Sequence, residues 1–344
     1  MLVLVLFPAL AFAQQLQETI TVERVLIDAR VTDAKGDPIL ELTPDDFVVK
    51  FDGKLAKVES VDWIPETAVA RELAGVEKED VQVTAPASTP DVIAPAGRLF
   101  IIFVQTDFGR ANVRVRGQMH FTQSADKLLE MMEPEDRAAV FSFDSHLKFR
   151  LDFTSDQEDI RYAIESAIQI DEPNWPRIVP NPSLARRLDR DEMKKATSAE
   201  EALVLIGNAL RPIPGPKSML LLGWGLGYLF GGRVHMPKEY VVAKRVLETA
   251  RVSIFALDTT EADYHDLELG LQQAAGDTGG FYAKTHIFPG LAIERLHRTL
   301  SGHYELEVRR PDDLKRGVHA IEVTVKRKGV INVLARSTWV DEAR

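Results

Sequence analysis

Three short segments of this chain combine residue types that carry out catalysis in other proteins. Asp144-Ser145-His146 contains a carboxylate, a hydroxyl and a base, but the members of a catalytic triad converge from different elements, so consecutive residues between two strands favour a turn. Asp277-Thr278-Gly279 has the triplet of the aspartic proteases, whose chemistry needs two carboxylates that share a proton, and the sequence has no second triplet. Ser124-Ala125-Asp126-Lys127 matches Ser-x-x-Lys, which often arises by chance on an amphipathic helix. We therefore predict two turns and a helix surface here rather than an active site.

Two further segments match nucleotide-binding motifs at some of their positions. Gly223-Trp224-Gly225-Leu226-Gly227 follows a predicted strand, but the third glycine of Gly-x-Gly-x-x-Gly would fall on Tyr228 or Phe230. We expect these glycines to be flexible. Pro216-Lys217-Ser218 has the last residues of a phosphate loop, but Arg211 and the proline occupy both glycine positions and a strand follows. The sequence therefore predicts no nucleotide site.

Composition argues against several other classes of site. The absence of cysteine excludes thiolate metal sites and a cysteine nucleophile. A net charge of −10 argues against nucleic-acid binding, because such proteins concentrate Lys and Arg on one surface. The histidines lack ligand spacing such as His-x-x-x-His and are expected at the surface or its boundary. We predict no cofactor and no metal ion. These histidines include His120, His235, His265, His286 and His297.

The elements that would position a site follow from hydrophobic periodicity. Leu99 to Val104 is apolar on both faces, which predicts a central strand of a parallel sheet covered by helices on each side. Alternating strands and helices follow it, as in a doubly wound α/β layer, whose ligands bind at the carboxyl ends of the strands. The expected strands are 99–104, 138–143, 147–153, 218–222, 252–257 and 279–284, and the expected helices are 112–132, 160–168, 192–210, 238–250, 266–275 and 291–300.

Both ends of the chain have the alternation of half-buried antiparallel strands, at 25–31 and 47–51 and again at 304–308, 321–325 and 331–339. Two strands and three strands are too few for separate stable sheets, so we expect one antiparallel β-sandwich with the α/β domain inserted in it. The expected parts are residues 14–70 and 303–344 for the sandwich, 71–97 for a linker and 98–302 for the α/β domain.

The first residues predict export. Leu2 to Ala13 is uncharged and almost wholly apolar, and it ends in Ala11-Phe12-Ala13, a small-x-small sequence like those that signal peptidase cuts. We expect residues 1–13 to be a signal peptide and the protein to be periplasmic or extracellular. Twelve residues are too few to span a bilayer, which needs about 20. The basic segment that usually comes first is missing, since the first basic residue is Arg24, so the start lies upstream or the signal is weak. An ordinary first strand is the alternative.

Several stretches, in their order and spacing, resemble the von Willebrand factor type A-related proteins of the acidobacterial type. That resemblance covers nearly the whole chain after residue 13 and implies an exported protein with a type A domain that binds a partner. The matching stretches are Val31-Thr32-Asp33-Ala34-Lys35-Gly36, Leu42-Thr43-Pro44-Asp45-Asp46-Phe47, Asp136-Arg137-Ala138-Ala139-Val140-Phe141-Ser142-Phe143-Asp144, Asp152-Phe153-Thr154-Ser155-Asp156, Thr278-Gly279-Gly280 and Leu300-Ser301-Gly302-His303-Tyr304.

The resemblance also implies a metal-ion-dependent adhesion site, from which this chain departs. The family supplies oxygen ligands for a Mg²⁺-like ion from Asp-x-Ser-x-Ser after the first strand, from a Thr, and from an Asp after the fourth strand. Here Gln105 and Gly109 stand at the first Asp and the second Ser, and Gly223-Trp224-Gly225 stands at the usual Thr-Asp-Gly. Asp107 alone could ligate. We expect a degenerate site that binds no metal.

The preferred hypothesis is therefore an exported, non-enzymatic protein-interaction module of the adhesion type. Without a bridging ion, aromatic and Arg side chains are the expected anchors; the alternative is that Trp224 and Phe108 only fill the space of the lost metal. A structural subunit of a cell-envelope assembly and an enzyme with an unrecognised site are the alternatives, favoured respectively by an apolar patch elsewhere and by a titratable pocket. The predicted binding residues are Gln105, Asp107, Phe108, Gly109, Arg110, Trp224 and Tyr228.

Overall fold

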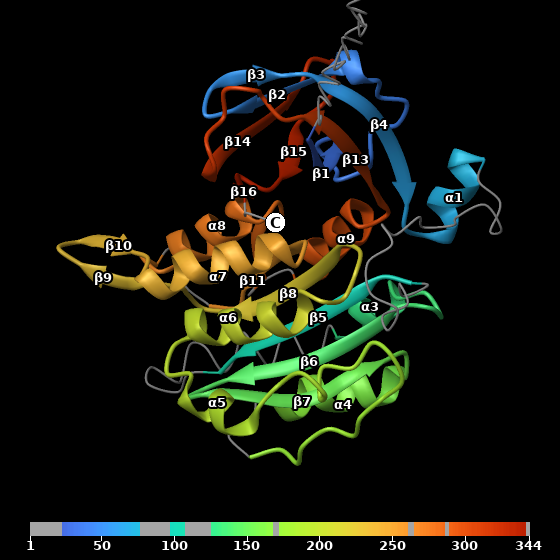
Figure 1. The fold of residues 1–344 in the computed structure, drawn as a ribbon. Helices are drawn as coiled ribbons and strands as arrows, with labels where there is room; N and C mark the ends of the chain where they lie inside the picture. Colours follow the sequence, from blue (N-terminus) through green and yellow to red (C-terminus); the bar gives the residue numbers. More distant parts are fainter. Residues whose placement is uncertain are drawn as a thin grey trace, which may run out of the picture.

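The computed structural model describes residues 23–75, 97–106, 125–167, 172–260, 265–285 and 289–341. An α/β layer built from the middle of the chain lies beside two antiparallel sheets, in which strands from the two ends of the chain come together (Figure 1). The candidates Asp107, Phe108, Gly109 and Arg110 lie outside the described residues, as do the expected signal peptide and Ser124. No helix within these ranges is both long and apolar enough to cross a bilayer.

The α/β layer contains a sheet of six strands in the order β12-β11-β8-β5-β6-β7. All neighbours in it are parallel except β6 and β7, so the predicted mixed α/β fold with a mostly parallel sheet is confirmed. The strands are β5 (Leu99–Gln105), β6 (Arg137–Phe143), β7 (Leu147–Thr154), β8 (Lys217–Gly223), β11 (Val252–Asp258) and β12 (Tyr282–Lys284).

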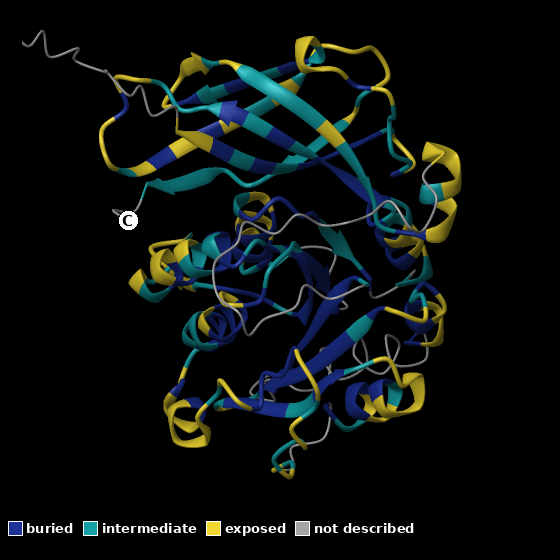
Figure 2. Ribbon diagram, turned by 45° about the vertical axis from the view of Figure 1, so that its right-hand side comes forward, coloured by how far each residue is buried: buried dark blue, intermediate teal, exposed yellow. Residues whose placement is uncertain are grey.

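Helices cover both faces of this sheet, which explains why every residue of β5 is buried. Leu99, Ile101 and Phe103 pack into one apolar cluster, while Phe100 and Ile102 pack into another, because successive side chains of a strand point to opposite faces. Figure 2 shows the buried strands between helices whose outer sides are exposed. The first cluster includes residues of α5 (Arg190–Lys195), α6 (Ala199–Leu210), α7 (Lys238–Thr249) and α8 (Glu268–Asp277), and the second includes residues of α3 (Ala125–Glu130), α4 (Gln157–Ala167) and α9 (Pro289–Thr299).

The prediction of a single helix over 192–210 is wrong. The chain forms α5 and α6 instead, since two N-cap residues each start a helix. The Asp189 carboxylate accepts hydrogen bonds from the backbone of Asp191 and Glu192, and the Ser198 hydroxyl accepts one from Glu201. The last strand of the layer is also shorter than expected, because Gly279, with φ +78°, turns the chain after α8 and β12 begins only at Tyr282.

The antiparallel part has two sheets of four strands, in the orders β15-β1-β13-β4 and β16-β14-β2-β3. Their inner faces share one apolar cluster, in which the Tyr304 ring contacts Phe47 and Trp63 with centroids 5.6 and 4.9 Å apart. Each sheet combines strands from both chain ends. The strands are β1 (Arg24–Thr32), β2 (Phe47–Phe51), β3 (Lys54–Ala56), β4 (Val58–Pro65), β13 (Gly302–Arg309), β14 (Gly317–Val325), β15 (Asn332–Ala335) and β16 (Thr338–Asp341), and a 3-10 turn η1 (Pro44–Asp46) precedes β2.

Three expectations for this part need correction. The single strand expected over 331–339 is two strands in different sheets, because Ser337 between them donates its backbone N–H to Asp277 at the end of α8. β3 and β4 were not expected. The linker expected over 71–97 is helical at its start, since α1 (Ala68–Ala74) begins at the Thr67 cap and ends at Gly75 with φ +67°. Residues 76–96 lie outside the described ranges.

Candidate functional site at the carboxyl ends of the central strands

The sheet order places a topological switch point between β5 and β8. The chain leaves β5 to form β6 on one side of it, and later forms β8 on its other side. Open α/β sheets bind their ligands in the crevice at such a point, outside the carboxyl ends of the strands. Gln105 is the last residue of β5 and Gly223 is the last residue of β8, so the two predicted loops meet here.

The Gln105 side-chain amide joins these two strand ends. Its Oε1 accepts hydrogen bonds from the backbone N–H groups of Trp224, at 3.1 Å, and Gly225, at 3.3 Å. Its Nε2 donates to the Gly225 carbonyl oxygen at 2.9 Å. The side chain is buried, with 4% of the residue exposed. A neutral amide therefore holds the loop after β8 in place.

The glycines of this loop are not free to vary, contrary to the expectation that they serve flexibility. A Cβ on Gly223 would lie 2.7 Å from the Gln105 Oε1 atom, and a Cβ on Gly225 would lie 2.5 Å from the Cβ of Leu267. Gly225 thus needs to be glycine, because the Leu267 Cβ atom cannot move without its backbone, whereas a Cβ on Gly223 would force the Gln105 amide to shift. Trp224 between them is half-buried.

Beyond this loop the chain forms a hairpin that the sequence analysis missed. β9 (Tyr228–Phe230) pairs with β10 (Arg233–His235), and the two strands project from the α/β layer (Figure 1). Gly231 and Gly232 both have positive φ, at 58° and 72°, as a two-residue turn of type I′ requires. The Gly-Gly pair, which follows the apolar triplet Tyr228-Leu229-Phe230, was the available sequence signal.

The hairpin presents apolar side chains to water. Tyr228 is 52% exposed and Phe230 is 71% exposed. Their rings both contact the His235 ring, with centroids 5.9 and 6.1 Å from it. At the base of the hairpin, the Gly227 N–H donates to the buried Glu200 carboxylate at 2.6 Å, which anchors the arm to α6. Tyr228, a predicted binding residue, is therefore accessible, whereas Gln105 is buried.

A titratable cluster that sequence analysis missed lies one strand away, at the end of β11. The fully buried Asp258 carboxylate accepts hydrogen bonds from the His265 ring at 2.8 Å and from the Tyr282 hydroxyl at 2.7 Å. Burial acts to raise the pKa of Asp258, but these hydrogen bonds and those from Thr260 outweigh it and hold the pKa below its ordinary value. Glu268 lies beside them and pairs with Lys284 at 2.8 Å. A carboxylate at a strand end was the sequence signal.

The Asp144-Ser145-His146 segment forms the expected turn between β6 and β7. The Ser145 hydroxyl lies 3.0 Å from the Asp144 carboxylate and 3.1 Å from His146 Nδ1, and His146 Nε2 lies 3.2 Å from Glu172. Lys148 closes the other side of the turn by pairing with Asp144 at 2.7 Å. These contacts hold three consecutive residues in one turn and tie that turn to the neighbouring loop.

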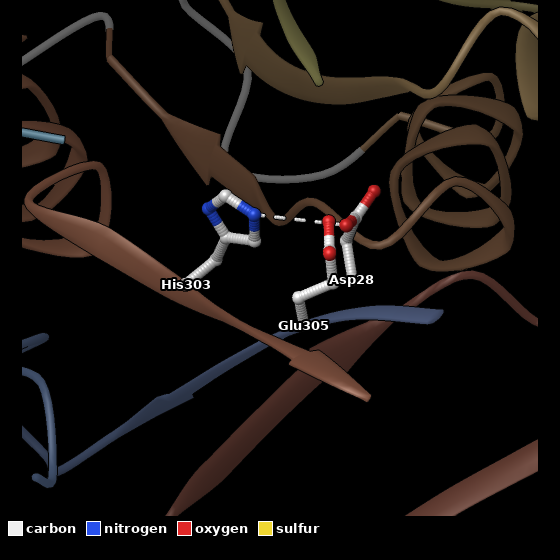
Figure 3. Close-up of side chains that lie close together, drawn as sticks. All are labelled: Asp28, His303 and Glu305. Carbon is white, nitrogen blue, oxygen red and sulfur yellow. Dashed lines mark ion pairs between the residues drawn. The ribbon is translucent and has the colours of Figure 1, made fainter. Parts of the chain in front are cut away.

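A second group of potential metal ligands lies far from this face, between β1 and β13. Asp28, His303 and Glu305 point into the same space, with His303 Nε2 3.6 Å from Asp28 Oδ1 (Figure 3). Arg251 immediately precedes β11. Its guanidinium donates hydrogen bonds to both carboxylate oxygens of Asp28, at 2.5 and 2.9 Å, and to the Glu305 carboxylate at 2.9 Å. Burial acts to raise the pKa of Asp28, but Arg251 holds it well below its ordinary value. The group is therefore an ion-pair network that joins the antiparallel sheets to the α/β layer.

Comparison with known proteins finds similar structures but no sequence family. No protein-family model matches the chain, and no curated protein matches it. A von Willebrand factor type A protein from Catenulispora acidiphila is similar in structure, with 10% sequence identity and a TM-score of 0.41 over 71% of this chain and 67% of that one.

Two Bacteroides proteins are also similar in structure. An aerotolerance-related membrane protein from Bacteroides fragilis has 13% identity and a TM-score of 0.40, over 59% of this chain and 98% of that one. BatB from Bacteroides thetaiotaomicron has 14% identity and a TM-score of 0.40, over 60% and 98%. The structural neighbours thus include a type A protein, while the narrower resemblance to the acidobacterial type has no support among them.

Proposed function

We propose that this protein is an exported, non-enzymatic interaction module that binds a protein partner at the carboxyl ends of its central strands without a bridging cation. The observation that carries the proposal is the Gln105 amide, which holds the backbone of Trp224 and Gly225 by three hydrogen bonds. Carboxylates gathered in such a place repel one another until an ion neutralises them. A neutral amide has no such requirement, so the loop is held in one conformation whether or not a divalent ion is present.

The exposed aromatic hairpin supports the same proposal. Tyr and Arg are enriched among the residues that contribute most to protein–protein binding, and Tyr228 and Arg233 belong to an arm that also exposes Phe230. The Gly231-Gly232 turn and the anchor at Glu200 fix the arm before a partner arrives. A pre-ordered arm loses less conformational entropy on binding than a flexible loop would.

The finer features of the hypothesis belong to this proposal as well. We infer that the α/β unit, residues 98–302, is an insertion into a β-sandwich formed by residues 14–70 and 303–344. This is supported by the pairing of β1 with β13 and of β2 with β14, since each pair joins the two ends of the chain. Export is supported by the apolar segment from Leu2 to Ala13, and the degenerate adhesion site by Gln105.

Partner capture from a cell-envelope extract tests the proposal. Wild-type protein is immobilised beside Tyr228→Ala, Phe230→Ala and Arg110→Ala, and the retained proteins are quantified by mass spectrometry. Tyr162→Ala is the matched control, because Tyr162 is 73% exposed but lies on α4. We expect a several-fold loss of one specific partner with the two hairpin variants and with Arg110→Ala, none with the control, and full capture in the presence of a chelator.

Two results would contradict this proposal. If the hairpin variants retain their fold by circular dichroism and still capture the partner fully, the hairpin is not the binding surface. If chelator abolishes capture, the interaction depends on a cation. The alternatives make other predictions: a structural subunit would be captured through a different surface, and an enzyme would turn over a substrate.

A further inference from the structure

The cluster at the end of β11 takes no part in the proposed partner contact, and its composition points to a different ligand. Asp258 ends β11, Glu268 begins α8, and His265 lies just before that helix. Each offers one ligand atom, and these three atoms lie within 4.8 Å of one another. They combine an imidazole nitrogen with two carboxylate oxygens, and Zn²⁺ accepts both kinds of donor.

We propose that Asp258, His265 and Glu268 bind a divalent transition-metal ion, with Zn²⁺ preferred over Mg²⁺ and Ca²⁺. The imidazole decides the preference, because Zn²⁺ takes nitrogen ligands readily, whereas Mg²⁺ and Ca²⁺ take oxygen ligands. This site is distinct from the switch point, where Gln105 links β5 to β8.

The His265–Asp258 pair needs only a small adjustment to accept the ion, beside the Tyr282 hydroxyl that donates to the same Asp258 oxygen at 2.7 Å. His265 Nε2 and Asp258 Oδ2 are 2.8 Å apart and share a hydrogen bond. Zinc bonds of about 2.0–2.2 Å in a tetrahedral arrangement hold two ligand atoms roughly 3.3–3.6 Å apart. When the ion binds, the proton between the two side chains would move to Nδ1 of the imidazole or be released to solvent, and the two ligand atoms would separate by about 0.5–0.8 Å. Asp258 is fully buried, whereas the His265 side chain is 20% exposed and gives the ion a path from solvent.

The charge of the cluster also favours a cation. Among the described residues of the cluster, two carboxylates face a single ammonium group, that of Lys284. Lys284 pairs with Glu268 from the last position of β12, with 26% of its side chain exposed, so its ammonium can turn toward water when an ion enters. The Asp28 network differs, because Arg251 holds both carboxylate oxygens of Asp28.

An ion here would brace the loop that the proposed function uses, without forming part of the partner contact. Leu267, between His265 and Glu268, packs against Gly225, which leaves no room for a Cβ on that residue. Binding at His265 and Glu268 would therefore fix the start of α8 against the loop that Gln105 holds. We expect added Zn²⁺ to raise the thermal unfolding midpoint, since a ligand of the folded state alone stabilises it.

Metal titration of the purified full chain, with its affinity tag removed, tests the proposal. Calorimetry with Zn²⁺ and the visible absorption of Co²⁺ should each report one equivalent per chain. We expect His265→Ala to weaken Zn²⁺ binding at least about tenfold. Even the loss of a residue that only hydrogen-bonds to a metal ligand typically weakens metal binding by about 10–100-fold. His235→Ala is the matched control, because His235 is an exposed histidine of the β9–β10 hairpin. Lys284→Met should strengthen binding several-fold, since it removes the competing ammonium.

Asp258 is left intact in these variants because its burial makes a folding defect the expected result of replacing it. Zn²⁺ binding that is as tight in His265→Ala as in the wild type would overturn the proposal, and so would weaker binding in Lys284→Met. Failure here leaves the proposed function standing, because partner capture is measured separately and in the presence of a chelator.

Discussion

Replacing Gln105 by leucine tests the idea that an amide has taken over the structural role of an ion at the switch point. Leucine has a similar volume and no polar atoms, so Gln105→Leu removes the hydrogen bonds and leaves the apolar packing largely in place. The backbone N–H and C=O of Gly225, both buried, then lose their partner, and so does the N–H of Trp224.

The expected loss follows from these three contacts. A hydrogen bond contributes about 1 kcal/mol net to stability, and a buried group left without its partner costs about 1–3 kcal/mol. Because the three contacts share one side chain and partly compensate one another, we expect Gln105→Leu to destabilise the protein by about 2–4 kcal/mol. At about 2–4 °C per kcal/mol for a domain of this size, the unfolding midpoint should fall by roughly 5–15 °C.

Differential scanning calorimetry in chelator gives the midpoint, and hydrogen exchange localises the change. Gln273→Leu, at an exposed position of α8, is the matched control and should leave the midpoint within about 2 °C of wild type. Protection should be lost at Trp224 and Gly225 in Gln105→Leu alone. If the midpoint and the protection of these two amides are unchanged, the amide does not hold the loop and the reasoning from its hydrogen bonds is refuted.

Three further predictions concern ions and pH. Mg²⁺, Mn²⁺ and Ca²⁺ should show no calorimetric binding at the first loop, and binding near micromolar affinity that Asp107→Ala abolishes would prove this wrong. Burial, with Arg251 nearby, lowers the pKa of Lys217 from 10.5 to about 7. Between these pH values the unfolded chain holds a proton that the folded chain has released, so the free energy of unfolding should rise with pH. Lys217→Met should flatten this rise, as measured by urea titrations at several pH values. The lowered pKa of Asp28 means that its contribution is present at neutral pH and lost in acid, so Asp28→Asn should destabilise by about 1–3 kcal/mol at pH 7, with the difference shrinking below about pH 4.

Hydrophobic pattern was enough to predict the layers of this fold. The run from Leu99 to Val104 predicted a strand buried on both faces, and its side chains do divide between two clusters. That prediction succeeds because burial on both faces removes the need for polar positions in the strand. The alternation at residues 25–31 and 304–308 was equally informative, since β1 and β13 each have one face in the shared apolar core.

Local polar signals were underused, and the errors in element boundaries follow from this. Asp189 and Ser198 are both good N-cap residues, and together they divide the helix expected over 192–210. Gly231-Gly232 specifies the turn of the β9–β10 hairpin. Thr67 and Gly75 mark the two ends of α1 in what was expected to begin a linker. In each case a backbone requirement at one or two residues outweighed the periodicity around it.

The sequence could predict that the two loops meet, but not how their residues contact one another. Gln105 and Trp224 stand at the carboxyl ends of two predicted parallel strands, and such ends meet at one edge of a sheet. The two residues are indeed in contact, through a hydrogen bond of 3.1 Å. The amide hydrogen bonds join positions 120 residues apart, which no local pattern reports. The pairing of His265 with Asp258 spans only seven residues, but it follows no regular ligand spacing, and only the carboxylate at the strand end signalled it.

An amide and an ion hold a loop in different ways, and the difference bears on what this edge of the sheet can do. The occupancy of an ion site depends on the concentration of the ion. The Gln105 amide is neutral, and its hydrogen bonds do not depend on metal. Asp258 on β11 is paired in register with Gly223 on β8. The loop that Gln105 holds therefore lies next to the titratable cluster at the end of β11. The proposed partner binding at the hairpin would therefore need no metal, while an ion at Asp258 would change only how firmly α8 supports the loop.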